Sequence, residues 1–267
     1  MTQFSNARPA AVVTGASEGI GAELARVFAA KGHEVAIVAR RGDRLATLAE
    51  DIAAKGHKRP IVVELDLLSE GAAETLAARL SEAGLAPQYL VNNAGFGLIG
   101  AIADLDQAEQ LAMIDLNIRA LTALTLRFLP SLTQTKGGVM NVASVASFMP
   151  GPGFAVYYAT KAFVRSFSEA ISYELKPAGV KVSCLCPGPV LTGFQARAGM
   201  SYDGLMSAMK PALVPAEEVA RQGYEGLMAG RRVVVPGTMN KFMVWSARLS
   251  PRAILLPLLG TAQMKRV

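Results

Sequence analysis

Short apolar runs alternate along this chain with longer stretches in which apolar residues recur at helical spacing. Residues 10–13 form the first run, and Ile20, Leu24 and Phe28 then mark one face of a helix. Further runs typical of strands lie at residues 35–39, 61–65, 89–92, 139–143, 180–186 and 233–235. Alternating strands and helices predict a single doubly wound, Rossmann-like α/β domain, with a parallel sheet of six or seven strands and helices on both faces.

Helices are expected between these runs, at about residues 20–30, 69–82, 106–129, 156–175 and 215–228. One more helix carries Leu45, Leu48 and Ile52 on one face, and Asp43 is expected to cap it. A parallel sheet gathers the carboxyl ends of its strands at one edge, and ligands bind outside that edge. The residues that follow each strand are therefore the candidates for a functional site.

A glycine-rich turn at residues 14–21 joins the first strand to the first helix. Its glycines let the backbone approach a pyrophosphate, and the helix N-terminus presents unpaired N–H groups to an anion. The spacing Gly-x-x-x-Gly-x-Gly differs from the commoner Gly-x-Gly-x-x-Gly, and glycines also serve plain turns, so the later motifs must support this interpretation. The expected cofactor contacts in the turn are Gly15, Ser17, Gly19, Ile20 and Gly21.

Two arginines follow the second strand. An acidic residue at this point would bind the adenosine ribose hydroxyls of NAD, whereas Ala39-Arg40-Arg41 suits the 2′-phosphate of NADP. We therefore predict NADP(H) as the cofactor and NAD as the less favoured one. An arginine pair in a surface loop is otherwise an ordinary feature.

The next two strands end in residues that suit other parts of a dinucleotide. Asp66 and Leu67 follow the third strand, where a carboxylate can accept the adenine amino group. Asn93, Ala94 and Gly95 follow the fourth strand and are small or polar, as a backbone that lies against a cofactor requires.

A serine, a tyrosine and a lysine follow the fifth strand. Ser144 comes directly after it, Tyr157 lies thirteen residues later, and Lys161 shares a helix face with Tyr157 at a spacing of four. A phenol has a pKa of about 10, and an ammonium beside it stabilises the phenolate and lowers that pKa. A serine hydroxyl can orient a carbonyl oxygen. The set predicts proton transfer to a carbonyl group, although a tyrosine–lysine pair alone also arises by chance.

In these residues and their order, the sequence resembles the short-chain dehydrogenase/reductase family over about residues 8–236. The matching motifs, in the family's order, are the 14–21 turn, Asp66, residues 92–95, Asn117, Ser144, Tyr157-x-x-x-Lys161 and Pro187-Gly188. The resemblance implies an oxidoreductase that transfers a hydride between a nicotinamide and a ketone or secondary alcohol. An apolar or acyl-type substrate is expected.

The resemblance also implies a role for each residue. Tyr157 would be the general acid, Ser144 would position the carbonyl, and Lys161 would lower the pKa of Tyr157 and bind the nicotinamide ribose. Asn117 would help to hold Lys161 through a water molecule, and Tyr158 is expected only to pack. Four further residues would close around the nicotinamide: Pro187, Gly188, Val190 and Thr192.

Two departures from the family pattern bear on this site. Many members have Ser-Ser after the fifth strand, and Ala143-Ser144 in this chain keeps the catalytic serine. Glu18 stands where some NADP-using members carry a basic residue. The 2′-phosphate would then depend on Arg40, Arg41 and Ser17.

A long segment at residues 191–215 is rich in Gly, Ala and Met and is expected to form a lid over the substrate. Its large residues are expected either to line an apolar pocket or to pack on the sheet: Phe194, Met200, Tyr202, Leu205, Met206 and Met209.

Residues 237–267 are expected to form a basic, apolar extension of a catalytic domain at residues 1–236. Seven basic and no acidic residues follow Gly230, and residues 1–230 hold 20 basic and 21 acidic ones. A core that binds nucleic acid is therefore not predicted. Arg248 and Arg252 disfavour a spanning helix. Trp245 and its apolar neighbours suit a peripheral membrane contact, a subunit contact or support for the lid.

The remaining features describe the class of protein. Cys184 and Cys186 alternate along a strand and are expected to be free, buried thiols, and with only two histidines no metal site is predicted. Residues 1–9 are too polar for a signal peptide, so a cytoplasmic protein is expected. A homo-oligomer, either a dimer or a tetramer, that acts on a small molecule is also expected. The alternative is a non-catalytic NADP(H)-binding sensor or scaffold, which would not need the proton-transfer residues.

Overall fold

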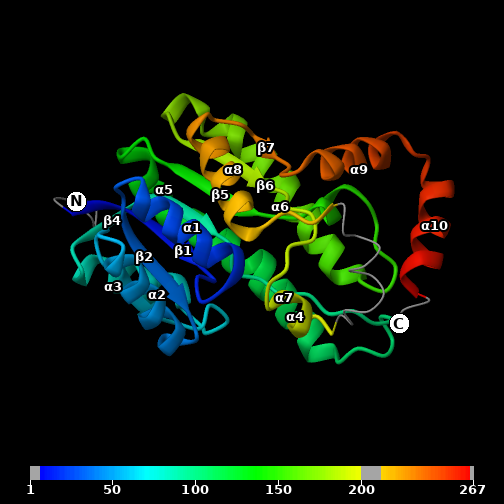
Figure 1. Ribbon diagram of the computed structural model, residues 1–267, viewed down its shortest axis with the longest axis horizontal. Helices are drawn as coiled ribbons and strands as arrows, with labels where there is room; N and C mark the ends of the chain where they lie inside the picture. Colours follow the sequence, from blue (N-terminus) through cyan, green and yellow to red (C-terminus); the bar gives the residue numbers. More distant parts are fainter. Residues whose placement is uncertain (1–6, 200–211, 265–267) are drawn as a thin grey trace.

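Seven parallel strands form one sheet in the computed structural model, which describes residues 7–199 and 212–264 (Figure 1). Their order across the sheet is β3-β2-β1-β4-β5-β6-β7. The strands are β1 (Arg8–Thr14), β2 (Glu34–Ala39), β3 (Ile61–Glu64), β4 (Leu85–Asn92), β5 (Gly138–Val142), β6 (Lys181–Leu185) and β7 (Val233–Val234). The doubly wound class predicted from the sequence is confirmed.

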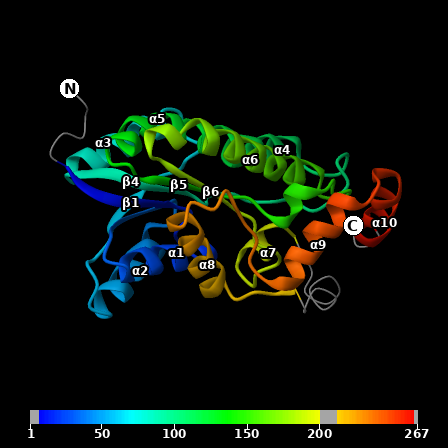
Figure 2. The same ribbon diagram turned by 90° about the horizontal axis from the view of Figure 1, so that it is seen from above.

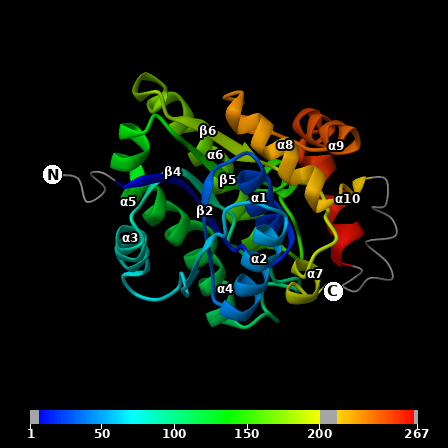
Figure 3. The same ribbon diagram turned by 60° about the vertical axis from the view of Figure 1, so that its left-hand side comes forward.

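Helices cover both faces of the sheet (Figure 2). One layer contains α1 (Gly19–Ala30), α2 (Gly42–Ala54) and α8 (Ala216–Met228). The other contains α3 (Ala72–Glu82), α4 (Gln107–Ile114), α5 (Leu121–Gln134) and α6 (Ala155–Glu174). The short helix α7 (Phe194–Arg197) and the last two helices, α9 (Thr238–Leu249) and α10 (Arg252–Met264), gather at one end of the molecule (Figures 1 and 3).

The strand β1 shows why a continuous apolar run forms the centre of this fold. Successive side chains of a strand point to opposite faces, so a strand that is covered on both faces is apolar throughout. Val13 belongs to the cluster that includes Phe28 of α1, whereas Val12 belongs to the cluster that includes Phe128 of α5. Both phenylalanines are fully buried. The two helix layers are therefore held by opposite faces of the same strand.

In the sheet, β2 lies beside β1 and β5 lies beside β4, so the chain continues in opposite directions after β1 and after β4. The loops after β1 and β4 consequently diverge, and a crevice opens at their carboxyl ends. The hydroxyl of Thr14 accepts hydrogen bonds from the backbone N–H groups of Asn93 (3.0 Å) and Ala94 (3.1 Å). The Asn93 amide donates in return to the Thr14 carbonyl at 3.0 Å. These contacts hold the loop after β4 against the glycine turn.

A buried polar chain ties α6 to the sheet, and no feature of the sequence had indicated it. The Asn92 amide of β4 donates to Asn141 of β5 at 2.9 Å and to Thr125 of α5 at 3.0 Å. Asn141 in turn donates to Ser168 of α6 at 2.9 Å. Because unpaired buried polar groups are costly, this chain fixes the position of α6 on β5.

Three local expectations are corrected. β4 begins four residues before the predicted start, because Leu85 and Ala86 pair with the beginning of β1. Asp43 is not the cap of α2. The N-cap is Arg41, and Asp43 lies in the first turn, where its carboxylate complements the positive end of the helix dipole. The third helix begins at Ala72, after the left-handed Gly71, rather than at Ser69.

The predicted helix at residues 106–129 is three consecutive helical segments. A π-helical segment, η1 (Asp115–Ala120), separates α4 from α5, and α5 continues to Gln134. Such π turns are rare and occur mainly at functional sites. The side chain that this one buries is Asn117.

Candidate active site

All the predicted site residues except Gly21 and Asn117 line one cavity of 1320 Å³ at the carboxyl ends of the strands. They come from the loops after β1 to β6, from the first turn of α1 and from the first turns of α6. Residues as far apart in the sequence as Gly15 and Thr192 meet here. The cavity is larger than typical small-molecule sites, which hold roughly 300–1,000 Å³, as a dinucleotide together with a substrate requires.

The glycine turn fits a dinucleotide phosphate. Gly15 has φ +64°, and a Cβ there would lie 2.8 Å from the Ala94 Cα. The N-terminus of α1 has no side-chain cap and no acidic residue in its first turn, so its N–H groups remain available at the cavity wall formed by Gly19 and Ile20. Gly21 does not line the cavity: a Cβ there would lie 2.3 Å from the Gly15 carbonyl oxygen, so this glycine keeps the turn tight, and its contact with the cofactor stays a prediction.

Arginines line the end of the cavity that follows β2. Arg41 pairs with Glu18 at 2.9 Å and donates to the Ser17 hydroxyl at 2.9 Å, and Arg44 pairs with the same carboxylate at 2.6 Å. The guanidinium of Arg40 is 66% exposed and has only a 3.9 Å contact with Asp66. Sequence reasoning missed Arg44, although its position one turn beyond Arg41 on α2 was a usable signal.

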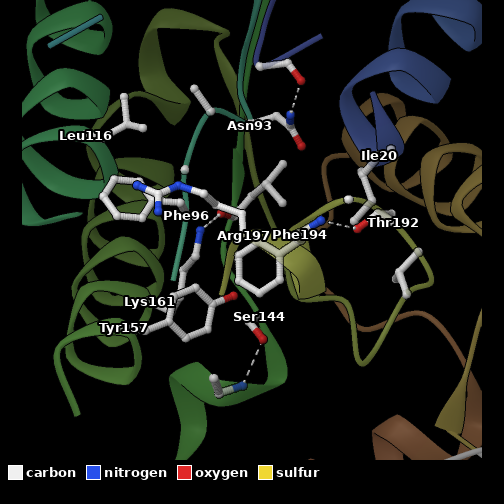
Figure 4. Close-up of a pocket in the computed structure, with 18 of the residues that line it drawn as sticks. Ile20, Asn93, Phe96, Leu116, Ser144, Tyr157, Lys161, Thr192, Phe194 and Arg197 are labelled. Atoms are coloured by element: carbon white, nitrogen blue, oxygen red, sulfur yellow. Dashed lines mark hydrogen bonds between the residues drawn. The ribbon is translucent and has the colours of Figure 1, made fainter. Parts of the chain in front are cut away.

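The group at the other end of the cavity consists of Ser144, Tyr157 and Lys161 (Figure 4). Tyr157 is buried, stacks on Phe154 with ring centroids 4.4 Å apart, and shares a hydrogen bond with Ser144. The Lys161 ammonium donates to the Val142 carbonyl at 2.9 Å and lies 5.7 Å from the centroid of the Tyr157 ring. The helix α6 thus brings the tyrosine and the lysine to the serine that follows β5.

Burial determines how this group titrates. It raises the pKa of Tyr157 above its ordinary value, and the hydrogen bond with Ser144 only partly opposes this. Burial also lowers the pKa of Lys161 to about 8. Burial is the largest cause of the shift at Tyr157, and the expected lowering of the Tyr157 pKa by Lys161 is not found. A phenol with a raised pKa keeps its proton at neutral pH and can donate it.

Asn117 lies behind the cavity wall. Its amide oxygen accepts from the Phe96 N–H at 3.1 Å, and its amide nitrogen donates to the Phe96 carbonyl and the Thr160 hydroxyl, each at 3.0 Å. Asn117 therefore connects the loop after β4 to α6. The water-mediated link to Lys161 stays a prediction.

The loops after β3 and β6 supply the remaining predicted contacts. Asp66 and Leu67 line the cavity, and Asp66 accepts a hydrogen bond from the Leu68 N–H at 3.0 Å. Four residues after β6 line the side toward α7: Pro187, Gly188, Val190 and Thr192. The Thr192 hydroxyl accepts from the Phe194 N–H at 3.3 Å and orients the start of α7.

Apolar side chains form the wall next to Tyr157. Phe154 and Phe194 contact the tyrosine ring, and Met243 and Leu259 reach the cavity from α9 and α10. The five other lid residues named from the sequence lie outside the described residues. Sequence reasoning missed the contribution of α9 and α10, because periodicity does not show which side of a helix meets a distant pocket.

Tyr158 is more than a packing residue. Its hydroxyl accepts a hydrogen bond from the Gln263 amide at 3.0 Å, and both residues line the cavity. The last turn of α10 is thereby attached to α6 next to the candidate acid.

Cys184 and Cys186 are free and buried, as expected, with their sulfurs 3.6 Å apart. Within the described part of the chain, no group of three or more His, Cys, Asp or Glu side chains is placed to hold a metal ion. The chemistry of the site is that of a buried phenol, a serine hydroxyl and an ammonium.

This chain is similar in sequence and in fold to known proteins. The model of the short chain dehydrogenase family matches residues 9–202. The chain is 38% identical over 186 residues to sulfoacetaldehyde reductase 2 of Chromohalobacter salexigens, covering 68% of this chain and 73% of that protein. It is 34% identical over 218 residues to serine 3-dehydrogenase of Agrobacterium fabrum, covering 80% and 85%. A short-chain dehydrogenase from Sphingobium yanoikuyae in complex with NADPH superposes with a TM-score of 0.76 at 30% identity, covering 97% and 96%.

Proposed function

The chain belongs to the short-chain dehydrogenase/reductase family and is an oxidoreductase that acts on CH–OH groups, and we propose that it uses NADP(H) to interconvert an apolar or acyl-type ketone and its alcohol. The observation that carries the proposal is the group of Ser144, Tyr157 and Lys161 in one cavity. Apolar side chains form the wall next to this group, and arginines line the opposite end of the cavity. We further propose a catalytic unit at residues 1–236 with a lid at about 191–215.

Each side chain of the site has a separate role in the reaction. When bound, the nicotinamide supplies or accepts the hydride at the carbonyl carbon. In the reducing direction Ser144 donates a hydrogen bond to the carbonyl oxygen, and Tyr157 transfers its hydroxyl proton to that oxygen. In the reverse direction the Tyr157 phenolate takes the proton back. Lys161 stabilises that phenolate and binds the nicotinamide ribose.

Three arginines support NADP(H) rather than NAD(H). Arg40, Arg41 and Arg44 line the cavity end that follows β2, where a 2′-phosphate would lie. Glu18 already pairs with Arg41 and Arg44, so a 2′-phosphate must share those two guanidinium groups with a carboxylate. The nearly free Arg40 is therefore proposed as the main phosphate contact. The Sphingobium yanoikuyae relative was solved with NADPH.

The lining of the cavity supports an apolar substrate. The rings of Phe154 and Phe194 and the side chains of Met243 and Leu259 face the space beside Tyr157. Arg197 also reaches this space, but it pairs with Glu109 at 3.0 Å and stacks on Phe96 at 4.8 Å. Its charge is thus neutralised before any anionic substrate arrives. This differs from sulfoacetaldehyde and serine, the small polar substrates that the names of two relatives give.

A panel of ketones tests the proposal. Consumption of NADPH is measured with short, branched and long-chain ketones, and again with NADH. We expect kcat/KM to rise with the apolar length of the ketone and to be higher with NADPH. Tight NADPH binding without turnover of any carbonyl would instead indicate the sensor function.

The pH dependence provides a second test. Because burial lowers the pKa of Lys161 to about 8, its ammonium is present below that pH and lost above it. The nearest titratable thiol, Cys184, has a raised pKa and stays neutral in this range. We expect kcat/KM for ketone reduction to be level below about pH 7 and to fall above about pH 8. A level profile up to about pH 10 would contradict the role of Lys161.

A further inference from the structure

The helix α9 has one face toward the protein and an apolar face toward solvent. Val244 and Ala247 are buried, and Met243 reaches the cavity. On the outer side, Phe242, Trp245 and Leu249 are 61%, 59% and 65% exposed. Large apolar side chains at spacings of three and four normally mark the buried face of a helix. Here they mark the outer one.

The helix α10 repeats this arrangement. Leu255 is buried, and Leu259 and Gln263 line the cavity. Ile254 and Leu258, four residues apart, are each 65% exposed. We call the five most exposed large apolar residues of the two helices the apolar outer face: Phe242, Trp245, Leu249, Ile254 and Leu258.

Basic side chains flank the apolar outer face. Lys241 and Arg248 are exposed on α9, next to Trp245 and Leu249 in the helix. Arg248 stacks on the Phe148 ring at 4.9 Å, and Arg252 at the start of α10 donates to the Phe148 carbonyl at 3.5 Å. No acidic residue follows Glu225 in the sequence.

We infer that α9 and α10 dock on an anionic lipid surface, with the apolar outer face in the interface and the basic residues among the headgroups. An aromatic and aliphatic face flanked by Lys and Arg is the pattern of helices that lie in the membrane interface. None of the helices in the described residues is both long and apolar enough to cross a membrane.

The charge argues against a second copy of this chain as the occupant. In a two-fold symmetric contact the same patch is used by both copies, so Lys241, Arg248 and Arg252 of one copy would be brought near the same basic patch of the other without an acidic partner from these helices. An anionic lipid surface supplies the missing negative charge.

The docked position would also serve the substrate, and this part of the inference rests on the proposed function. Met243 and Leu259 line the cavity from the inner sides of the same two helices. The lipid surface would therefore lie about one helix diameter, roughly 10–12 Å, from the substrate wall. An apolar ketone dissolved in the membrane would enter the cavity without crossing water.

Vesicle sedimentation tests the inference on the full-length protein. Phosphatidylcholine vesicles with and without phosphatidylglycerol are used at about 50 mM and about 500 mM salt. We expect binding to the anionic vesicles that falls at least about tenfold at high salt or in the double variant Phe242→Ser/Trp245→Ser. Leu126→Ser on α5 is the matched control, because Leu126 is also 61% exposed, and it should bind normally.

Further readouts separate the outcomes. Thermal unfolding and NADPH binding show whether each variant is folded, and Lys241→Glu, a surface change, should weaken vesicle binding independently. Absence of binding to anionic vesicles overturns the inference, as does an oligomeric state that only Phe242→Ser/Trp245→Ser disrupts. Turnover of soluble ketones is measured in parallel, so that a failure of membrane docking is distinguished from a failure of the proposed function.

Discussion

Replacing Tyr157 with Phe should lower kcat for ketone reduction by about a hundredfold to ten-thousandfold, the range that a positioned general acid contributes. The substitution removes the hydroxyl that shares a hydrogen bond with Ser144 and keeps the ring that stacks on Phe154. Single-turnover rates and NADPH titration measure the effect. NADPH affinity should change by no more than a few-fold, because the hydroxyl acts on the substrate oxygen.

Tyr158→Phe is the matched control for this prediction. Tyr158 is the next residue of α6, and its hydroxyl is engaged with Gln263. Its loss is expected to change KM more than kcat, because it loosens the attachment of α10 to the cavity wall. Equal losses of kcat in the two variants would contradict the assignment of Tyr157 as the acid.

Replacing Arg40 with Ala should weaken NADPH binding by about tenfold to a hundredfold and leave NADH nearly unchanged. A hydrogen bond to a charged group contributes about 1.5–3 kcal/mol, and about 1.4 kcal/mol corresponds to a factor of ten. Because Arg40 is 66% exposed, we expect the lower part of this range. Equilibrium titration with both cofactors measures the difference.

Arg59→Ala serves as the control for Arg40→Ala. Arg59 is 50% exposed and pairs with Glu50, and it does not line the cavity. This variant removes the same charge from the protein without touching the proposed phosphate contact. An equal loss of NADPH affinity in both variants would indicate a general charge effect, and a wild-type protein that prefers NADH would contradict the cofactor proposal.

The sequence by itself determined the fold class and most of the cavity. Runs such as that in β1 are apolar throughout because strands of a parallel sheet are buried on both faces, and the ends of those strands hold the ligand. Gly15, Ser144 and Tyr157 could therefore be placed in one site before their distances were known. Their chemistry is local: a left-handed glycine, a hydroxyl after a strand and a phenol on a helix.

Contacts between distant segments were decided only by the tertiary structure. The carboxylate of Glu18 pairs with both Arg41 and Arg44, and Asn117 contacts Phe96. Each of these contacts joins segments that no period or spacing relates. The raised pKa of Tyr157 likewise depends on burial, which the spacing to Lys161 does not reveal.

The helices α9 and α10 show most clearly which features the sequence determines and which depend on the tertiary structure. The sequence indicated an apolar, basic segment after residue 236, but it could not tell that Met243 faces the cavity and Trp245 faces solvent. Both residues are apolar and lie two positions apart on one helix. Which face of a helix is buried depends on where the rest of the chain packs against it, because the hydrophobic effect rewards burial without specifying a partner.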